Sequence, residues 1–178
     1  MKKVLIISSS LRAHSNSDAL ATAFAEGARE AGHVVECISL KGKEIRFCTA
    51  CYACKKTGRC VAPDDAPEII SKIQVADVVV LATPIYYYEM CGQLKTLLDR
   101  TVSIYNEPYT FRDVYLLATA AEDEPSTPER AFNGLGGWVE CFEKARIAGQ
   151  VFAGGVYEQN TILGHSALET ARKMGAAI

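Results

Sequence analysis

The chain has 178 residues, of which 49% are hydrophobic and 22% are charged, and its formal net charge is −2. A chain of this length fits one domain of ordinary size with a well-buried core. Binding along a nucleic acid needs a clear excess of positive charge, so the charge balance excludes nucleic acid as the main partner. No apolar run reaches the roughly 18 residues that a membrane span requires, and no membrane association is expected.

The N-terminal segment resembles the start of a signal peptide because two lysines precede an apolar stretch. That stretch, Val4–Ile7, is much shorter than the roughly 7–15 apolar residues of a signal peptide. It is better interpreted as a buried strand that begins the domain, and we expect a cytoplasmic protein.

Apolar, β-branched runs alternate with helical patterns, which is typical of βαβ units around a parallel sheet. The run at 78–82 is apolar at every position, as a central parallel strand buried on both faces must be. No repeat, low-complexity tract or linker interrupts the pattern, so we expect a single three-layer domain over residues 1–178. Strands are expected at 4–8, 34–39, 78–82, 114–119 and 150–152.

Five helices are expected between and after these strands. Asn16 and Ser17 can cap the first helix, and Gly32 can end it. The other helices are expected after Asp65, around 94–102, over about 127–144, and around 168–175. In these helices, Val102 is expected on a buried stripe, and Gly175 is expected to end the last one.

The segment 8–17, which follows the first expected strand, is rich in hydrogen-bonding groups. It contains five serines together with Arg12 and Asn16. A phosphate suits this place because a helix N-terminus offers free N–H groups and the positive end of the helix dipole. The segment lacks the glycine patterns that bind a pyrophosphate or a nucleoside triphosphate, so a monophosphate is the expected ligand. A polar turn whose serines only cap the helix is the alternative.

This segment resembles the phosphate loop of the NAD(P)H-dependent FMN reductases and multimeric flavodoxins. The resemblance is carried by Ser10, Arg12, Ser15, Asn16 and Ser17, and it implies that these residues bind the phosphate of FMN. It also implies a flavodoxin-like, doubly wound α/β fold with a five-stranded parallel sheet in the order 2-1-3-4-5.

A second motif resembles the same family more strongly. Residues 83–95 read TPIYYYEMCGQLK and are followed by Asp99 and Arg100, which we expect to be structural or to lie at a subunit contact. A flavin ring is flat and largely apolar, so aromatic side chains and backbone groups suit it. Tyrosines exposed at a surface or a subunit interface are the alternative. The resemblance implies flavin contacts from Thr83, Pro84, Ile85, Tyr86 and Tyr87, and a weaker match adds Thr119 and Ala120.

The chain has seven cysteines, and four of them form a C-x2-C-x2-C-x5-C motif: Cys48, Cys51, Cys54 and Cys60. In a reducing cytosol such a cluster indicates metal binding or redox chemistry. Four thiolates satisfy a [4Fe–4S] cluster, whereas structural zinc sites usually show two separated pairs. The motif resembles that of the iron–sulfur flavoproteins, which share the flavodoxin-like fold. Redox-active thiols and inert cysteines remain as alternatives.

The cysteine segment, residues 41–60, carries six Lys or Arg residues against one Glu. Such a basic surface also suits an anionic electron donor such as NADPH. Because this segment follows the second strand, it should reach the same rim of the sheet as the flavin loops. Any group that the cysteines hold is therefore expected close to the FMN.

The expected function is an FMN-dependent oxidoreductase that passes electrons from NAD(P)H to a small acceptor such as a quinone, azo compound, flavin or metal species. The flavin carries the chemistry, so no catalytic side chain is assigned. The alternative is an electron carrier that accepts electrons from a ferredoxin, and a third reading is a non-redox protein that binds another monophosphate. A homodimer or homotetramer is expected. His14, His33 and His165 are isolated and are expected to cap helices or lie at the surface.

Overall fold

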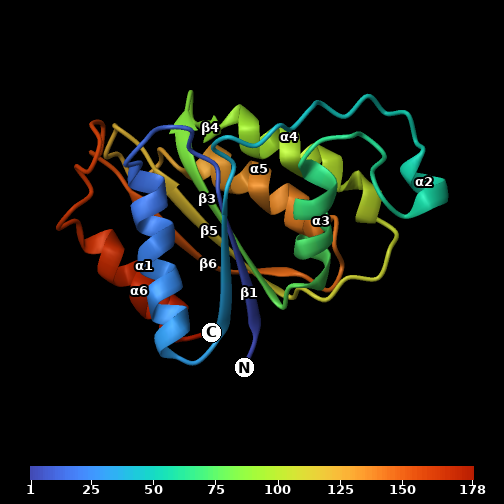
Figure 1. Ribbon diagram of the computed structural model, residues 1–178. Coiled ribbons are helices and arrows are strands. Elements are labelled where there is room, and N and C mark those ends of the chain that lie inside the picture. Colours follow the sequence, from blue (N-terminus) through green and yellow to red (C-terminus); the bar gives the residue numbers. More distant parts are fainter.

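A computed structural model describes all residues from Met1 to Ile178. It contains a six-stranded sheet in which five strands are parallel, in the order β2-β1-β3-β5-β6, and β4 pairs only with β3 (Figure 1). The strands are β1 (Lys3–Ser8), β2 (Val34–Ser39), β3 (Val78–Tyr86), β4 (Glu89–Met90), β5 (Asp113–Thr119) and β6 (Arg146–Ala153). The predicted flavodoxin-like sheet and its 2-1-3-4-5 order are confirmed, with β5 and β6 as the predicted fourth and fifth strands.

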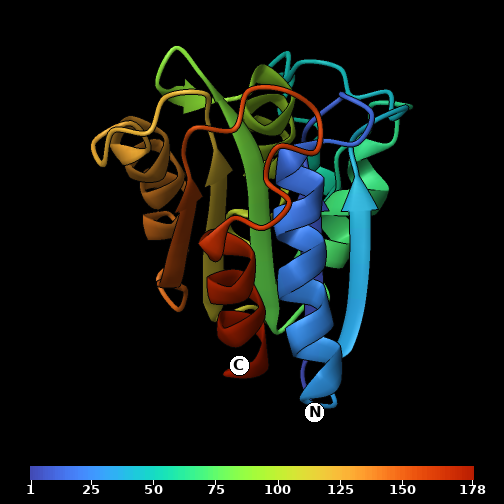
Figure 2. The ribbon, with the colours of Figure 1, turned by 90° about the vertical axis from the view of Figure 1, so that its left-hand side faces the viewer.

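Helices cover both faces of the sheet. The helices are α1 (Asn16–Glu30), α2 (Cys54–Thr57), α3 (Ala66–Val75), α4 (Gly92–Arg100), the 3-10 helix η1 (Thr101–Ile104), α5 (Glu129–Glu140) and α6 (Ser166–Ala176). Helices α1 and α6 lie side by side on one face (Figure 2), while α3, α4 and α5 cover the other face.

Successive side chains of β1 point to opposite faces of the sheet and so contribute to two hydrophobic cores, one on each face. Leu5 and Ile7 point into the core beneath α3, α4 and α5, whereas Val4 and Ile6 point into the core beneath α1 and α6. In β3 the segment 78–82 is buried at every position. Both faces of a parallel sheet must be covered, and this explains why these strands are continuously apolar.

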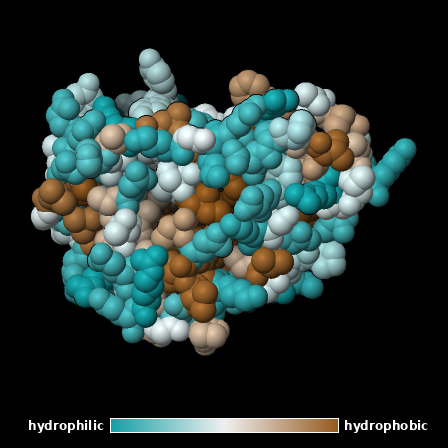
Figure 3. Space-filling view, in the orientation of Figure 1, coloured by the Kyte–Doolittle hydropathy of each residue, from teal (hydrophilic) through white to brown (hydrophobic).

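Strand β2 forms one edge of the sheet, and none of its residues is buried. Hydrophobic residues reach the surface among hydrophilic ones on the face that carries this edge (Figure 3), and Val34 is one of the exposed hydrophobic residues. No helix is both long and apolar enough to cross a membrane.

Three sequence predictions about helices were wrong. The first helix is capped by Ser15, whose hydroxyl accepts a hydrogen bond from the N–H of Asp18 at 3.3 Å, and not by Asn16 or Ser17. The α4 stripe ends before Val102, which lies in η1 and is exposed. Gly175 does not end α6, because that helix continues to Ala176.

Other elements differ from the prediction in length or were missed. Helix α5 is shorter than the predicted 127–144, and β6 is longer than the predicted 150–152. The four-residue helix α2 and the short strand β4 were not predicted. Gly32 does follow α1 with φ +83, as a helix-ending glycine should, and His165 caps α6 by accepting from the N–H of Ala167.

Gly27 and Gly175 allow α1 and α6 to approach each other closely. A Cβ atom at Gly27 would collide with the backbone oxygen of Arg172, and one at Gly175 would collide with the backbone oxygen of Phe24. Each helix therefore presents a glycine to the backbone of the other, and this contact is the reason that Gly175 lies within a helix.

We predict that Gly27→Ala and Gly175→Ala will each lower the free energy of unfolding by about 1–3 kcal/mol, because the added methyl group forces two backbones apart. Gly137→Ala is the matched control, since this glycine lies in α5 with open space around its Cβ position. The free energy of unfolding of the control should rise by up to about 1 kcal/mol, because alanine has a higher helix propensity than glycine. Urea unfolding gives the free energy of unfolding of all three variants. An unchanged value for both Gly27→Ala and Gly175→Ala would contradict the close contact between α1 and α6.

Candidate functional site

The loop between β1 and α1 places buried backbone donors at the start of a helix. Ser15, Asn16 and Ser17 are all buried, and their N–H groups donate to no acceptor within the chain. Buried N–H groups are almost always paired, and at a helix N-terminus an anion is the usual partner. The backbone at this point therefore fits a phosphate group.

A cavity of about 160 Å³ is lined by all three of these residues. It brings together all but two of the residues that the sequence assigned to FMN, the two exceptions being Thr83 and Tyr87. The sequence prediction missed Ala121, Val156 and Tyr157, which also line it. The complete lining is Ser10, Arg12, Ser15, Asn16, Ser17, Pro84, Ile85, Tyr86, Thr119, Ala120, Ala121, Val156 and Tyr157.

The side chain of Asn16 holds the loop after β6 against this cavity. Its Nδ2 donates to the backbone oxygens of Val156 and Glu158, at 3.1 and 2.9 Å, and lies 3.3 Å from Oγ1 of Thr161. Its Oδ1 accepts from the N–H of Ile162. The hydrogen-bonding groups of the Asn16 side chain are therefore engaged within the protein. Only the backbone N–H of Asn16 remains to bind an anion.

Two further contacts close the cavity. The Ser17 and Thr119 hydroxyls are hydrogen-bonded to each other at 2.9 Å, which joins α1 to the end of β5. The Nη1 of Arg12 donates to the backbone oxygen of Tyr157 at 2.6 Å, and the guanidinium lies 6.0 Å from the centre of the Tyr157 ring. The loop after β6 supplies Val156 and Tyr157 to the cavity, and the sequence assigned no role to either residue.

Thr83 lies outside the cavity because its side chain is buried in the protein. Its hydroxyl accepts from the N–H of Cys91 at 3.0 Å and donates to the backbone oxygen of Pro84 at 2.9 Å. The Sγ of Cys91 in turn donates to the hydroxyl of Ser9 at 3.1 Å. These contacts join the end of β3, the start of α4 and the phosphate loop, so Thr83 positions the cavity wall.

The turn between β3 and β4 has a strained backbone. Tyr87 and Tyr88 both have positive φ, at 52° and 66°, between the paired residues Tyr86 and Glu89. A two-residue hairpin of this kind favours Asn and Gly, and a bulky residue at positive φ costs on the order of 1–3 kcal/mol. Tyr87 is 99% exposed, which is why it does not line the cavity.

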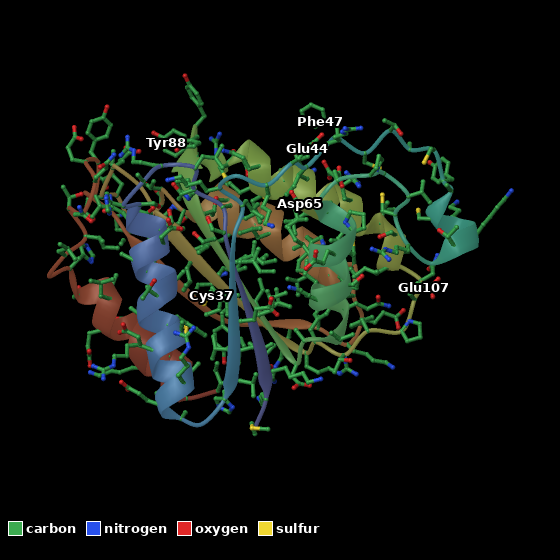
Figure 4. All side chains as sticks on the ribbon, viewed as in Figure 1. Cys37, Glu44, Phe47, Asp65, Tyr88 and Glu107 are labelled. Atoms are coloured by element: carbon green, nitrogen blue, oxygen red, sulfur yellow. The ribbon has the colours of Figure 1, made fainter.

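Tyr88 is tied to the neighbouring loop and to α5. A hydrogen bond to the carboxylate of Glu122 raises the pKa of the Tyr88 hydroxyl above its usual 10.0. The guanidinium of Arg130 lies 5.6 Å from the centre of the Tyr88 ring. Figure 4 shows Tyr88 at the edge of the molecule where the parallel strands end, with Phe47 farther along the same edge.

A second, larger cavity of about 670 Å³ contains the cysteine motif. It is lined by Arg46, Phe47, Cys48, Thr49, Ala50, Cys51, Tyr52, Cys54, Cys60, Val61, Ala62, Pro63, Asp99, Arg100, Val102 and Ser103. All four motif cysteines therefore border one space. Figure 1 shows the loop after β2 running past α4 to α2, at the end of the molecule away from α1.

The four sulfurs can supply the ligand set of an iron–sulfur cluster, but they are not drawn together in this arrangement. No three of them are grouped closely enough to hold a metal ion. Ala50 and Tyr52, which flank Cys51, have positive φ values of 52° and 56°, so the loop has a strained backbone between its first three cysteines. The donor chemistry fits four-thiolate ligation, and convergence on one centre requires the loop to close.

A buried ion pair supports one side of this cavity. The side chains of Arg100 and Asp64 are 1% and 0% exposed and form an ion pair at 2.7 Å. Burial pushes the pKa of the Asp64 carboxyl upward, but hydrogen bonds from Arg100, Arg46 and Ala66 outweigh it and hold this pKa below 3.8. The guanidinium also donates to Sγ of Cys60, from Nε at 3.2 Å and from Nη2 at 3.0 Å. The structural role expected for Arg100 is thus observed next to a motif cysteine.

The two cavities lie at opposite ends of α4 and share no lining residue. Cys91 precedes α4 and contacts Ser9 beside the smaller cavity, whereas Arg100 ends α4 at the cysteine cavity. A nine-residue helix spans about 13 Å at about 1.5 Å per residue. The cysteines and the flavin loops of the same chain therefore lie toward opposite ends of α4, because the segment after β2 extends along α4 instead of folding back over β1.

Comparison with known proteins agrees with this geometry. The sequence model of the family described as NADPH-dependent FMN reductase matches residues 2–128. The iron-sulfur flavoprotein of Methanosarcina thermophila is 27% identical over 177 residues, covering 97% of this chain and 93% of that protein. An iron-sulfur flavoprotein of Methanocaldococcus jannaschii is 38% identical over 99 residues, covering 56% of this chain and 51% of that protein.

Two solved structures share the fold over nearly the whole chain. An NAD(P)H:quinone oxidoreductase from Methanothermobacter marburgensis superposes with a TM-score of 0.73 and 20% identity, covering 98% of each chain. An azoreductase from Bacillus anthracis superposes with a TM-score of 0.71 and 17% identity, covering 100% of each chain.

We predict that Tyr87→Asn will raise the free energy of unfolding by on the order of 1 kcal/mol, because asparagine tolerates positive φ. Tyr105→Asn is the control, since Tyr105 is also exposed but has an ordinary φ of −57°. Urea unfolding of the two variants compares them directly. If Tyr87→Asn is no more stable than the original chain, the strain assigned to this turn is refuted.

Proposed function

The chain belongs to the NADPH-dependent FMN reductase family, and from that premise we propose that it is an FMN-dependent oxidoreductase passing electrons from NAD(P)H to a small acceptor. The observation that carries this proposal is the row of unpaired N–H groups at residues 15–17, which line one cavity together with Pro84, Ile85 and Tyr86. A phosphate and a flat ring joined in one molecule match these two halves of the cavity.

In this proposal, the residues of the cavity bind and orient the cofactor. The N–H groups at the start of α1 and the guanidinium of Arg12 bind the phosphate, while Pro84, Ile85 and Tyr86 contact the ring. Asn16 and Thr83 act indirectly, since their side chains hold the loop after β6 and the start of α4. When bound, FMN supplies hydride and single-electron chemistry that no side chain of the cavity offers.

The acceptor is proposed to be a small planar or redox-active molecule: a quinone, an azo compound, a free flavin or a metal species. The rim of the cavity supports this class, because Tyr86 and Tyr157 are aromatic residues that are more than half exposed. Exposed aromatic rings offer stacking surfaces to a flat partner. Either NADH or NADPH fits the proposal as electron donor.

A second candidate is an electron carrier that accepts electrons from a ferredoxin through a [4Fe–4S] cluster. This candidate is favoured by the common cavity of the four cysteines and by the curated relatives, which are named iron-sulfur flavoproteins. Anaerobic assays with NADH, NADPH and reduced ferredoxin separate the two candidates. Rapid turnover with a nicotinamide donor supports the reductase, and reduction by ferredoxin alone supports the carrier.

We further propose a homodimer or homotetramer in which the tyrosine turn contacts another subunit. The support is the strained backbone that keeps Tyr87 almost fully exposed, since such strain is typically retained for function. Light scattering of the FMN-loaded protein tests this assembly, and a monomer at micromolar concentration would contradict it. A cytoplasmic location also stays a prediction.

We predict that Arg12→Ala will weaken FMN binding about ten- to a hundredfold, because one charge-assisted contact is worth about 1.5–3 kcal/mol. Arg12→Lys should lose less affinity for FMN than Arg12→Ala, since lysine keeps the positive charge. Arg29→Ala is the control, because Arg29 lies in the last turn of the same helix, away from the cavity. Fluorescence titration with FMN gives the dissociation constants, and unchanged affinity in Arg12→Ala would remove this residue from the site. If the original chain binds no added FMN, the proposed FMN-dependent function is overturned.

A further inference from the structure

We propose that Arg100 is the positioning residue of the cysteine site. Fixed by Asp64, its guanidinium holds Cys60 as the one preorganised ligand and sets the electrostatic environment of that sulfur. This inference rests on the proposed four-cysteine centre and concerns its regulation by a residue outside the motif.

The geometry of Arg100 leaves none of its donors free. A guanidinium has five N–H groups in a planar fork. Two of them go to Asp64, at 2.7 and 3.1 Å, and one goes to the backbone oxygen of Arg46 at 2.7 Å. The remaining two converge on Sγ of Cys60, at 3.2 and 3.0 Å. With every donor engaged and the side chain 1% exposed, the guanidinium has no room to change its orientation.

Asp64 extends this anchor to both ends of the cysteine segment. Its carboxylate accepts from the N–H of Arg46 at 2.9 Å and from the N–H of Ala66 at 3.1 Å. Arg46 lies two residues before Cys48, and Asp64 lies four residues after Cys60. The buried pair therefore pins the base of the loop that carries the motif.

Cys60 differs from the other three cysteines in its surroundings. Cys48 and Cys51 are exposed, and Cys54 is half-buried on the short helix α2. None of these three is hydrogen-bonded to a side chain of the protein, whereas Cys60 accepts two N–H groups from a buried cation. The loop can thus close around a sulfur whose position is already determined.

The two N–H groups that Arg100 donates to Cys60 also affect the charge that its sulfur can carry. A neutral thiol is a weak acceptor, and two donors of a permanently charged group suit the negative charge of a ligating thiolate far better. Hydrogen bonds to ligand sulfurs and nearby charge are among the features that set the reduction potential of an iron–sulfur cluster. A cation at one sulfur stabilises the more negative, reduced state, so Arg100 should raise the reduction potential.

The test compares Arg100→Lys with the double variant Arg100→Gln/Asp64→Asn after anaerobic reconstitution with iron and sulfide. Lysine keeps the charge but cannot reach Asp64 and Cys60 with one planar fork. The double variant removes both charges together, so that no unpaired buried charge is left to unfold the chain. Lys173→Gln is the control, because Lys173 lies on α6 in an exposed ion pair with Glu169, outside the lining of both cavities.

Three quantities are measured for each protein: bound iron and sulfide, the reduction potential of the cluster, and bound FMN. We expect both Arg100 variants to bind iron about 10- to 100-fold more weakly in a chelator competition, as is typical when a partner of a metal ligand is lost. The double variant should also show a more negative reduction potential. FMN content should stay that of the original chain in every variant, which reports that the fold is intact.

The outcomes separate this inference from the function on which it rests. Unchanged iron affinity and unchanged potential in both variants, with FMN bound, would overturn the role of Arg100 while leaving the four-cysteine centre in place. An original chain that takes up no iron would overturn the centre and this inference together, and the FMN reductase function would remain.

Discussion

All five long strands of the sheet are parallel, and this constraint determines where a ligand can bind. Their C-terminal ends meet at one edge, where the N-terminus of α1 also begins. Both faces of the sheet are covered by helices, so the edge is the place where backbone N–H groups can remain without partners inside the protein. The loop after β1, residues 84–86 and the end of β5 reach the same cavity for this reason.

Helix α4 connects this cavity with the cysteine site. At its start, the N–H of Cys91 is bound by Thr83, which stands directly before Pro84 of the cavity wall. At its end, Arg100 is locked to Asp64 and Cys60. A regular helix fixed at both ends behaves as a spacer of constant length. The two candidate redox sites are therefore held apart by a rigid element and do not share a wall.

The ion pair at the end of α4 carries a physical cost that its surroundings offset. Taking two charges out of water is expensive, and the attraction between them compensates only when the remaining donors and acceptors are satisfied. Here every N–H of Arg100 has an acceptor, and Asp64 accepts from two backbone N–H groups besides. A hydrophobic pair would fill the space at less cost, but it would not bind the sulfur of Cys60.

The sequence by itself determined the positions of the five parallel strands and the run of hydroxyl groups between the first strand and the first helix, whereas the sheet order and the flavin contacts were implied by the resemblance to a family. The strands and the hydroxyl run are local features: a buried strand is continuously apolar, and a phosphate loop concentrates hydroxyl groups before a helix. Only the tertiary structure decided that Thr83 and the side chain of Asn16 serve the protein's own loops, and that Tyr157 reaches the cavity. It also decided that Gly175 sits within a helix contact and that the cysteines lie across α4 from the flavin loops. Apart from Thr83, whose partners are Pro84 and Cys91, each of these depends on partners far away in the chain. Residue type and spacing alone carry no information about such partners.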